Sequence, residues 1–131
     1  MLILHITTWS AWQQAQAAGE YRTASLDKEG FIHFSRLHQV LGVANAFYRG
    51  QTDLVILGVD VARLKAELRE EAPVHPSALE NAPSAENLFP HLYGPLNLDA
   101  VAVVYDFLPE ADGSFKLPPQ IERDITDGLR R

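Results

Sequence analysis

The 131-residue sequence contains no cysteine. This absence excludes disulfide bonds, thiolate metal sites, iron–sulfur clusters and cysteine nucleophiles. Basic residues are also few, because 11 lysines and arginines stand against 17 aspartates and glutamates, for a formal net charge of −6. An acidic chain makes poor contact with nucleic-acid phosphates and anionic membranes. We therefore expect no bulk binding of nucleic acid, although a local basic pocket is compatible with this charge.

Long apolar runs are absent as well. No segment approaches the roughly 20 apolar residues that a membrane-spanning helix needs. The first residues, MLILHITTW, place only four apolar residues before His5, and no lysine or arginine precedes Arg22. A secretory signal needs a basic start and an apolar stretch of about 7–15 residues. The expected protein is therefore cytoplasmic, with no membrane partner.

Two kinds of glycine motif are missing. The sequence has no GxGxxG or GxxxxGK phosphate-binding loop, and it has no GxSxG segment. These absences exclude the classical dinucleotide-binding and P-loop folds and the usual hydrolase nucleophile elbow.

The apolar pattern predicts several short elements. Continuous apolar runs indicate buried strands, and helical spacing of apolar residues indicates two main helices. The expected strands are 2–7, 31–34, 53–60 and 101–108, with an edge strand at 68–71 and helices at 9–18 and 37–48. Their irregular order favours a small α+β fold with a bent or split mixed β-sheet flanked by the two main helices.

The remaining segments are predicted as loops and a tail. Residues 20–30 are polar, and residues 73–90 contain four prolines and few aliphatic side chains. Long loops in compact domains are usually functional or disordered. Residues 119–131 are charged and show no apolar period, so we expect a flexible C-terminal tail. The prediction is a single domain over residues 1–118.

Histidine and hydroxyl side chains share a face on two of the predicted strands. His5 and Thr7 lie two residues apart in one strand, and His33 and Ser35 lie two apart in another. Residues i and i+2 of a strand point to the same side. Adjacent strands would thus form a polar patch in an apolar sheet, and buried polar clusters are more often sites than scaffolding. The alternative is that each is a core histidine bonded to the backbone.

Two neighbouring segments add candidate groups. Glu29 precedes the second strand and could reach the patch as an acid or base, or it could be a solvated loop carboxylate. The segment FPHLYGP contains two prolines that stiffen the backbone, so it would present His91 and Tyr93 rigidly, and Gly94 permits close approach. Such a loop makes a wall for a planar ligand such as nicotinamide or adenine. It could equally plug the end of the sheet.

Zinc is an alternative for the three histidines at positions 5, 33 and 91. Three histidines with an open water position would support metal-assisted hydrolysis. However, no histidine pair has the i, i+4 spacing of HExxH, and no second-shell carboxylate is fixed nearby in the sequence. We therefore expect no metal.

Several motifs together resemble one known family. They are HIT near the start, GxYxxxSLxxEGFIHxS, VANxFY, DLVIL, FPHLYGPL and DGxFxLP, and they cover about residues 1–118. This pattern resembles the domain of unknown function 952 family, which is grouped by similarity with the ADP-ribosyltransferase-like fold. The resemblance implies a cleft between two short sheets, with NAD as the cofactor.

Within that superfamily the pattern is most similar to the RNA 2′-phosphotransferase branch, whose first strand carries His-Gly-Thr and whose second carries a histidine followed by Leu-Ser. The resemblance implies that His5 and Thr7 contact the ribose and the nicotinamide amide of NAD. It implies that His33 and Ser35 line the nicotinamide–ribose side. Leu4 stands where the phosphotransferases have an arginine.

Two hypotheses of different classes follow. The first is an NAD-binding, ADP-ribosyltransferase-like enzyme acting on a small or nucleotide-containing substrate, with Tyr93 and Gly94 against the NAD. Its catalytic candidates are His33, Glu29 and His91. The second is a non-enzymatic ligand-binding or regulatory module with a degenerate NAD cleft, which the lack of a catalytic glutamate late in the chain favours. The sequence predicts no oligomeric state.

Overall fold

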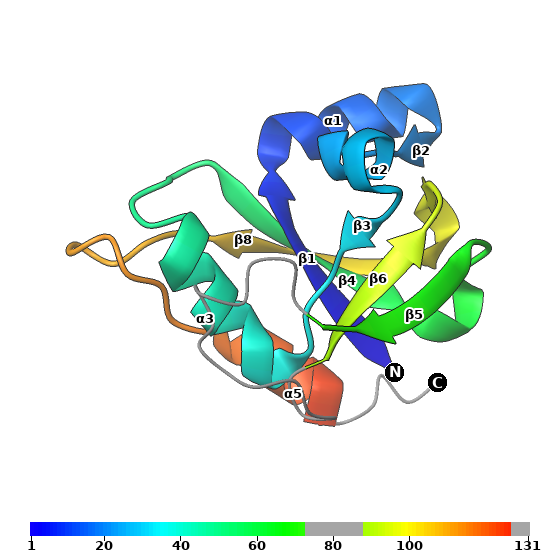
Figure 1. Ribbon diagram of the computed structural model, residues 1–131. Helices are drawn as coiled ribbons and strands as arrows, with labels where there is room; N and C mark the ends of the chain where they lie inside the picture. The colour runs from blue at the N-terminus through cyan, green and yellow to red at the C-terminus, as the bar shows by residue number, and fades with distance from the viewer. Residues whose placement is uncertain (73–87, 127–131) are drawn as a thin grey trace.

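The computed structural model describes residues 1–72 and 88–126. They form the predicted α+β fold, in which short sheets are combined with helices (Figure 1). In chain order the elements are β1 (Leu2–Thr8), α1 (Trp9–Ala18), β2 (Glu20–Tyr21), α2 (Ala24–Glu29), β3 (Ile32–His33), α3 (Leu37–Phe47), β4 (Leu54–Asp60), η1 (Val61–Arg63), β5 (Glu67–Glu71), β6 (Phe89–Tyr93), β7 (Leu96–Asn97), η3 (Leu98–Ala100), β8 (Val101–Phe107) and α5 (Pro119–Thr126). None of the helices in the described residues has both the length and the apolar character needed to cross a membrane.

The described strands form sheets in the orders β1-β4-β8, β2-β7 and β3-β6-β5. Every pairing among them is antiparallel, so the prediction of a mixed sheet is wrong for these strands. Parallel neighbours need a crossover connection, which is usually a helix. Here α1 leads from β1 to β2 and α3 leads from β3 to β4, so neither helix joins two strands of the same sheet.

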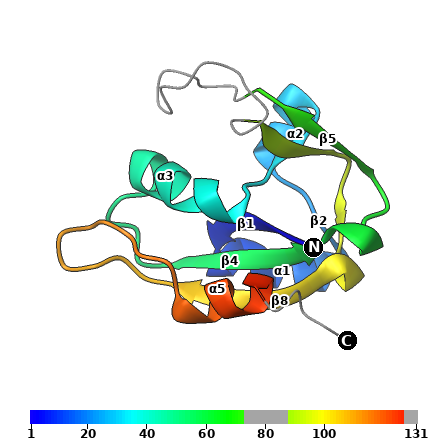
Figure 2. The ribbon, with the colours of Figure 1, turned by 90° about the horizontal axis from the view of Figure 1, so that it is seen from below.

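Within the described residues, the two three-stranded sheets share a single backbone bridge. The amides and carbonyls of Leu4 and Ser35 exchange two hydrogen bonds, of 2.8 and 2.7 Å. On its other edge β1 pairs with β4 along its whole length. Seen from below, β5 and β6 lie clearly apart from β4 and β8 (Figure 2). The predicted splitting of the sheet is therefore confirmed.

Strand alternation sends the side chains of β1 and β4 into two cores. Ile3 and Leu57 belong to a cluster that packs with α1 and the second sheet. Leu4 and Ile56 point the other way, into a cluster with α3 and α5. All four are fully buried, and each contributes roughly 1.5–3 kcal/mol by leaving water. His5 has the parity of Ile3, so the fold directs it between the two sheets.

The segment after residue 118 differs from the predicted flexible tail. Residues 119–126 form α5, and the side chain of Ile121 is fully buried in the core beside α3. The Tyr105 hydroxyl also donates a 2.6 Å hydrogen bond to the Asp124 carboxylate. Two isoleucines four residues apart, Ile121 and Ile125, form the apolar stripe, and so short a stripe gives no recognisable period. The part of the predicted tail at 127–131 lies outside the described residues.

The polar segment 20–30, predicted as a loop, contains helix α2. The helix begins after Thr23, whose hydroxyl accepts a hydrogen bond from the Leu26 amide, and it ends at Gly30, whose φ is +92°. A left-handed residue after a helix is usually glycine, because it has no Cβ to clash. Six helical residues are too few to show a period in the sequence.

The sequence also predicts a loop for the FPHLYGP segment, yet its first five residues form β6, the central strand of its sheet. Proline is rare in central strands because it lacks an amide donor. The carbonyl of Pro90 nevertheless accepts the Phe34 amide at 3.0 Å. The expected edge strand at 68–71 is confirmed as β5. Most of the loop predicted at 73–90 falls outside the described residues.

Candidate functional site

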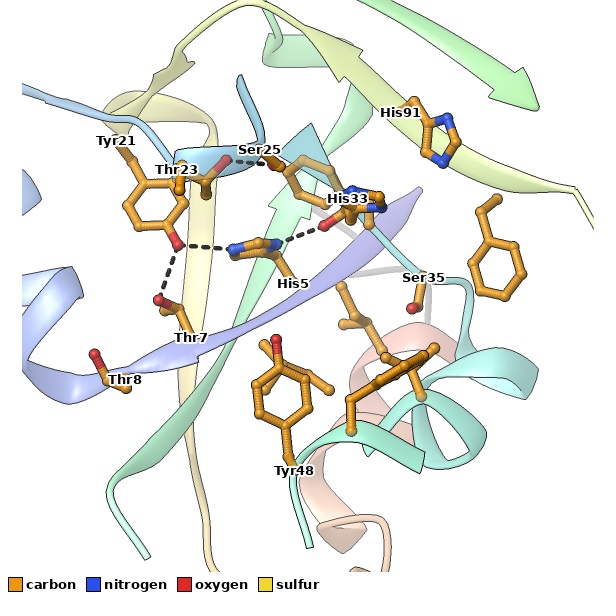
Figure 3. Close-up of a pocket in the computed structure, with 17 residues that line it drawn as sticks. His5, Thr7, Thr8, Tyr21, Thr23, Ser25, His33, Ser35, Tyr48 and His91 are labelled. Carbon is orange, nitrogen blue, oxygen red and sulfur yellow. Dashed lines mark hydrogen bonds between the residues drawn. The ribbon is translucent and has the colours of Figure 1, made fainter. Parts of the chain in front are cut away.

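A pocket of about 580 Å³ opens beside the backbone bridge, and Leu4 and Ser35 of that bridge line it (Figure 3). The polar side chains of its wall are His5, Thr7, Thr8, Tyr21, Thr23, Ser25, His33, Ser35, Tyr48 and His91. Among the described residues, no aspartate, glutamate, lysine or arginine lines it. Histidine is therefore the only ionisable type apart from tyrosine in this part of the wall.

The β3–β6 sheet supplies one wall through strict alternation. His33 lies directly opposite His91 in the antiparallel register. Both side chains line the pocket, whereas their neighbours Ile32 and Leu92 point into the core and are fully buried. Ser35 follows His33 by two residues and lines the same pocket. The pocket side of this small sheet therefore carries both histidines, while Ile32 and Leu92 on its other side belong to the core.

Strand β1 supplies the facing wall, and its side chains form a closed hydrogen-bond network. His5 Nδ1 lies 2.6 Å from the His33 carbonyl oxygen, and His5 Nε2 lies 2.7 Å from the Tyr21 hydroxyl. The hydroxyls of Tyr21 and Thr7 lie 2.8 Å apart (Figure 3). His5, Thr7 and Tyr21 are all buried. The network ties β1, β2 and β3 together at the pocket floor.

The protonation state of His5 determines which groups donate the hydrogen bonds of this network. Burial lowers the pKa of His5 to about 4, so the imidazole is neutral near pH 7. The nitrogen that faces a carbonyl must carry the proton, which leaves Nε2 as an acceptor for the Tyr21 hydroxyl. Because the single proton of the Tyr21 hydroxyl is donated to His5, the hydrogen bond between the two hydroxyls is donated by Thr7 and accepted by Tyr21. Burial also raises the pKa of Tyr21 to about 12. These groups therefore stay neutral and suit ligand recognition better than proton exchange.

His91 is held differently, by a carboxylate of β5. Its Nδ1 lies 2.8 Å from Glu71 Oε1, and the Tyr93 hydroxyl donates to the same oxygen at 2.5 Å. Burial is the largest effect on His91 and lowers its pKa. The hydrogen bonds from Tyr93 and His91 lower the pKa of Glu71, so this carboxylate is ionised near neutral pH.

Aromatic stacking fixes the same group of side chains. The Phe31 ring stacks on His91, with centroids 4.1 Å apart and planes at 16°. Its centroid lies 4.9 Å from that of His33 and 5.3 Å from that of Tyr93. The Arg69 guanidinium lies over the outer face of this cluster, 4.2 Å from the Tyr93 ring centroid. Phe31 therefore limits rotation of both histidines.

The structure brings five of the predicted site residues to the pocket wall: His5, Thr7, His33, Ser35 and His91. Glu29 is not part of the wall, but its carboxylate contacts His33 Nε2 at 2.9 Å. Tyr93 and Gly94, which were expected against the NAD, are not among the residues that line the pocket. Tyr93 supports Glu71, and Gly94 packs so closely on Ala66 that an added Cβ would lie 2.7 Å from the Ala66 Cβ.

The sequence does not predict several side chains of the site, and Tyr21, Tyr48 and Glu71 are three of them. Tyr21 reaches it through the short strand β2, and Tyr48 lies just after α3. Glu71 reaches His91 because β5 pairs with β6. The GxYxxxS spacing was a signal for Tyr21. Nothing local in the sequence marks Glu71, because its role depends on a pairing between distant strands. Among the described residues, no three histidine, aspartate or glutamate side chains come together to hold a metal ion.

Comparison with known proteins identifies relatives of this chain. Residues 6–104 match the model of the family described as "Protein of unknown function (DUF952)". No curated protein matches. The crystal structure of protein CC0527 from Caulobacter crescentus is similar, with 32% identity, coverage of 93% of this chain and 99% of that chain, and a TM-score of 0.78. The solution NMR structure of CC0527 gives 33% identity, 88% and 92% coverage, and a TM-score of 0.71. The chain therefore belongs to the DUF952 family of proteins of unknown function.

Proposed function

We propose that the pocket binds NAD through its nicotinamide riboside half, in the manner of the ADP-ribosyltransferase-like fold. One observation carries the proposal. A histidine–hydroxyl pair from each of two sheets, His5 with Thr7 and His33 with Ser35, converges on one pocket. Its volume of about 580 Å³ lies within the range of small-molecule sites, roughly 300–1,000 Å³.

Uncommitted polar groups in the wall support this proposal. Neither the Ser35 hydroxyl nor the Tyr48 hydroxyl has a hydrogen-bond partner among the described residues. Both residues line the pocket. Hydroxyls that face a pocket without a protein partner suit the ribose hydroxyls and the carboxamide of a ligand. Phe34 and Phe89 add ring surface for the planar base.

The charge of the wall indicates which half of NAD enters. No lysine or arginine from the described residues lines the pocket, and a buried diphosphate without a cation would be strongly disfavoured. The diphosphate and adenosine would therefore extend outward. We expect NAD to bind more tightly than ADP-ribose, which lacks nicotinamide.

The first candidate is an enzyme that uses the bound NAD, and the second is a non-enzymatic module that only binds it. The second is favoured because no carboxylate of the described residues lines the pocket to stabilise a cationic ribosyl group directly. An enzyme would release nicotinamide from NAD during incubation. A binding module would bind NAD and leave it intact, so chromatography of the incubated nucleotide separates the two candidates.

Calorimetric titration with NAD, ADP-ribose and nicotinamide tests the proposal. Ser35→Ala should weaken NAD about 5- to 10-fold, because a neutral hydrogen bond contributes roughly 1 kcal/mol. Ser10→Ala is the matched control, since Ser10 is exposed on α1 and outside the pocket. The proposal is wrong if the unmodified protein binds none of the three compounds, or if the two variants bind NAD equally well.

A further inference from the structure

The ring of His91 is oriented on both its edge and its face. Glu71 accepts from Nδ1 at 2.8 Å, and Phe31 stacks on the ring plane with centroids 4.1 Å apart. Glu71 is itself fixed by the Tyr93 hydroxyl at 2.5 Å. A carboxylate on Nδ1 keeps the proton on that nitrogen and leaves a lone pair on Nε2. The imidazole is therefore held in one tautomer.

Nδ1 of His91 is bonded to Glu71, whereas Nε2 has no hydrogen-bond partner among the described residues. Only 2% of His91 is exposed, and the residue lines the pocket. An oriented lone pair on a ring that lines a binding pocket is the geometry that a general base requires.

The other two histidines of the wall lack this combination. Both ring nitrogens of His5 are committed, one to the His33 carbonyl and one to Tyr21. The side chain of His33 is 40% exposed, and its Nε2 contacts Glu29. His91 alone among these three combines a buried ring, a carboxylate on one nitrogen and a second nitrogen that has no partner among the described residues.

We propose that His91 is the general base of a group transfer from NAD bound in this pocket, and that Glu71 is the residue that positions it. This inference rests on the proposed function, because the bound NAD supplies the reacting carbon. The acceptor is water or the hydroxyl of a small molecule.

The transfer balances without any further reactant. The acceptor oxygen attacks C1′ of the nicotinamide ribose and forms an O–C bond. The C–N bond to nicotinamide breaks, and its electron pair returns to the ring nitrogen, so nicotinamide leaves as a neutral molecule. The proton of the attacking O–H passes to His91 Nε2 and then to solvent. The products are ADP-ribose carried on the acceptor oxygen, nicotinamide and one proton.

The charged and titratable groups around His91 set its dependence on pH. Glu71 and Arg69 lie on β5, Tyr93 lies beside it on β6, and His33 with Glu29 faces it from β3 and α2. Burial lowers the pKa of His91 and favours the neutral, basic form. Loss of the Glu71 charge should lower that pKa further. Nicotinamide release should therefore rise with pH as His91 loses its proton, and Glu71→Gln should move this rise to lower pH.

The experiment combines calorimetry with NAD and chromatographic measurement of nicotinamide release. His91→Gln should bind NAD within about 3-fold of the unmodified protein and release nicotinamide at least about 100-fold more slowly, as expected for loss of a general base. Glu71→Gln should slow release less and shift the pH profile. Glu70→Gln is the matched control, because Glu70 is the neighbouring residue on β5 and pairs with Arg36. Nitrogen NMR should show a proton on Nδ1 and none on Nε2 of His91 at pH 7.

The outcomes separate the two proposals. Absence of NAD binding by the unmodified protein refutes the proposed function. NAD binding without nicotinamide release refutes the inference about His91 and leaves the binding function intact. Equal release by His91→Gln and the unmodified protein also refutes the inference. A change in Glu71→Gln that Glu70→Gln reproduces would show that Glu71 does not position His91.

Discussion

Replacing Tyr21 with phenylalanine removes the central hydroxyl of the network at the pocket floor. The Tyr21 hydroxyl lies 2.7 Å from His5 Nε2 and 2.8 Å from Thr7 Oγ1. Without it, a buried nitrogen acceptor is left unsatisfied, which costs about 1–3 kcal/mol. For a domain of this size each kcal/mol corresponds to roughly 3–5 °C in melting temperature, so we expect Tyr21→Phe to melt about 3–15 °C lower.

Thermal unfolding followed by circular dichroism measures this effect. Tyr48→Phe is the control, because the Tyr48 hydroxyl has no partner among the described residues and its loss should change the melting temperature little. A double-mutant cycle with Thr7→Val adds a second test. Since Tyr21 links Thr7 to His5, the two free-energy losses should be non-additive by about 0.5–3 kcal/mol. Equal melting of Tyr21→Phe and Tyr48→Phe, or strict additivity in the cycle, would refute the network.

Three further predictions concern acid stability, the C-terminal helix and metal. Burial lowers the pKa of His5 from 6.5 to about 4, so between these pH values the unfolded chain binds more protons than the folded protein. The urea midpoint of unfolding should therefore fall as the pH decreases from 7 to 4, and it should fall less steeply in His5→Asn. Ile121→Ala should lower stability by about 2–5 kcal/mol in urea unfolding, whereas a flexible tail would give no change. Elemental analysis of protein purified without added metal should find far less than one equivalent of zinc; stoichiometric zinc that is lost in His91→Ala would contradict the NAD proposal.

The local pattern of apolar residues is enough to predict the strands with continuous apolar runs and the two helices with helical apolar spacing. Strands β1, β4 and β8 and helices α1 and α3 lie close to their predicted positions. The i, i+2 spacing of His5 with Thr7 and of His33 with Ser35 placed these residues on shared faces, and all four line the pocket. Period-two alternation is a property of any strand, so the sequence carries this information directly.

The missed features depend on length or on distant pairing. Helices α2 and α5 are too short to show a period. Pro90 favours a loop prediction because proline is rare in central strands, yet it lies in the central strand β6. Glu71 and His91 lie twenty residues apart, and only the pairing of β5 with β6 brings them together. The sequence alone fixes neither this register nor the direction of the Thr7–Tyr21–His5 hydrogen bonds.

Binding of NAD at the pocket histidines is the central claim, and side-chain NMR during an NAD titration tests it most directly. His5, His33 and His91 belong to the pocket wall, whereas His38 lies exposed on α3 outside it and serves as an internal reference. The account predicts saturable shifts of the three pocket rings with one common dissociation constant, and little change at His38. Unchanged signals from His5, His33 and His91 at saturating NAD would contradict it.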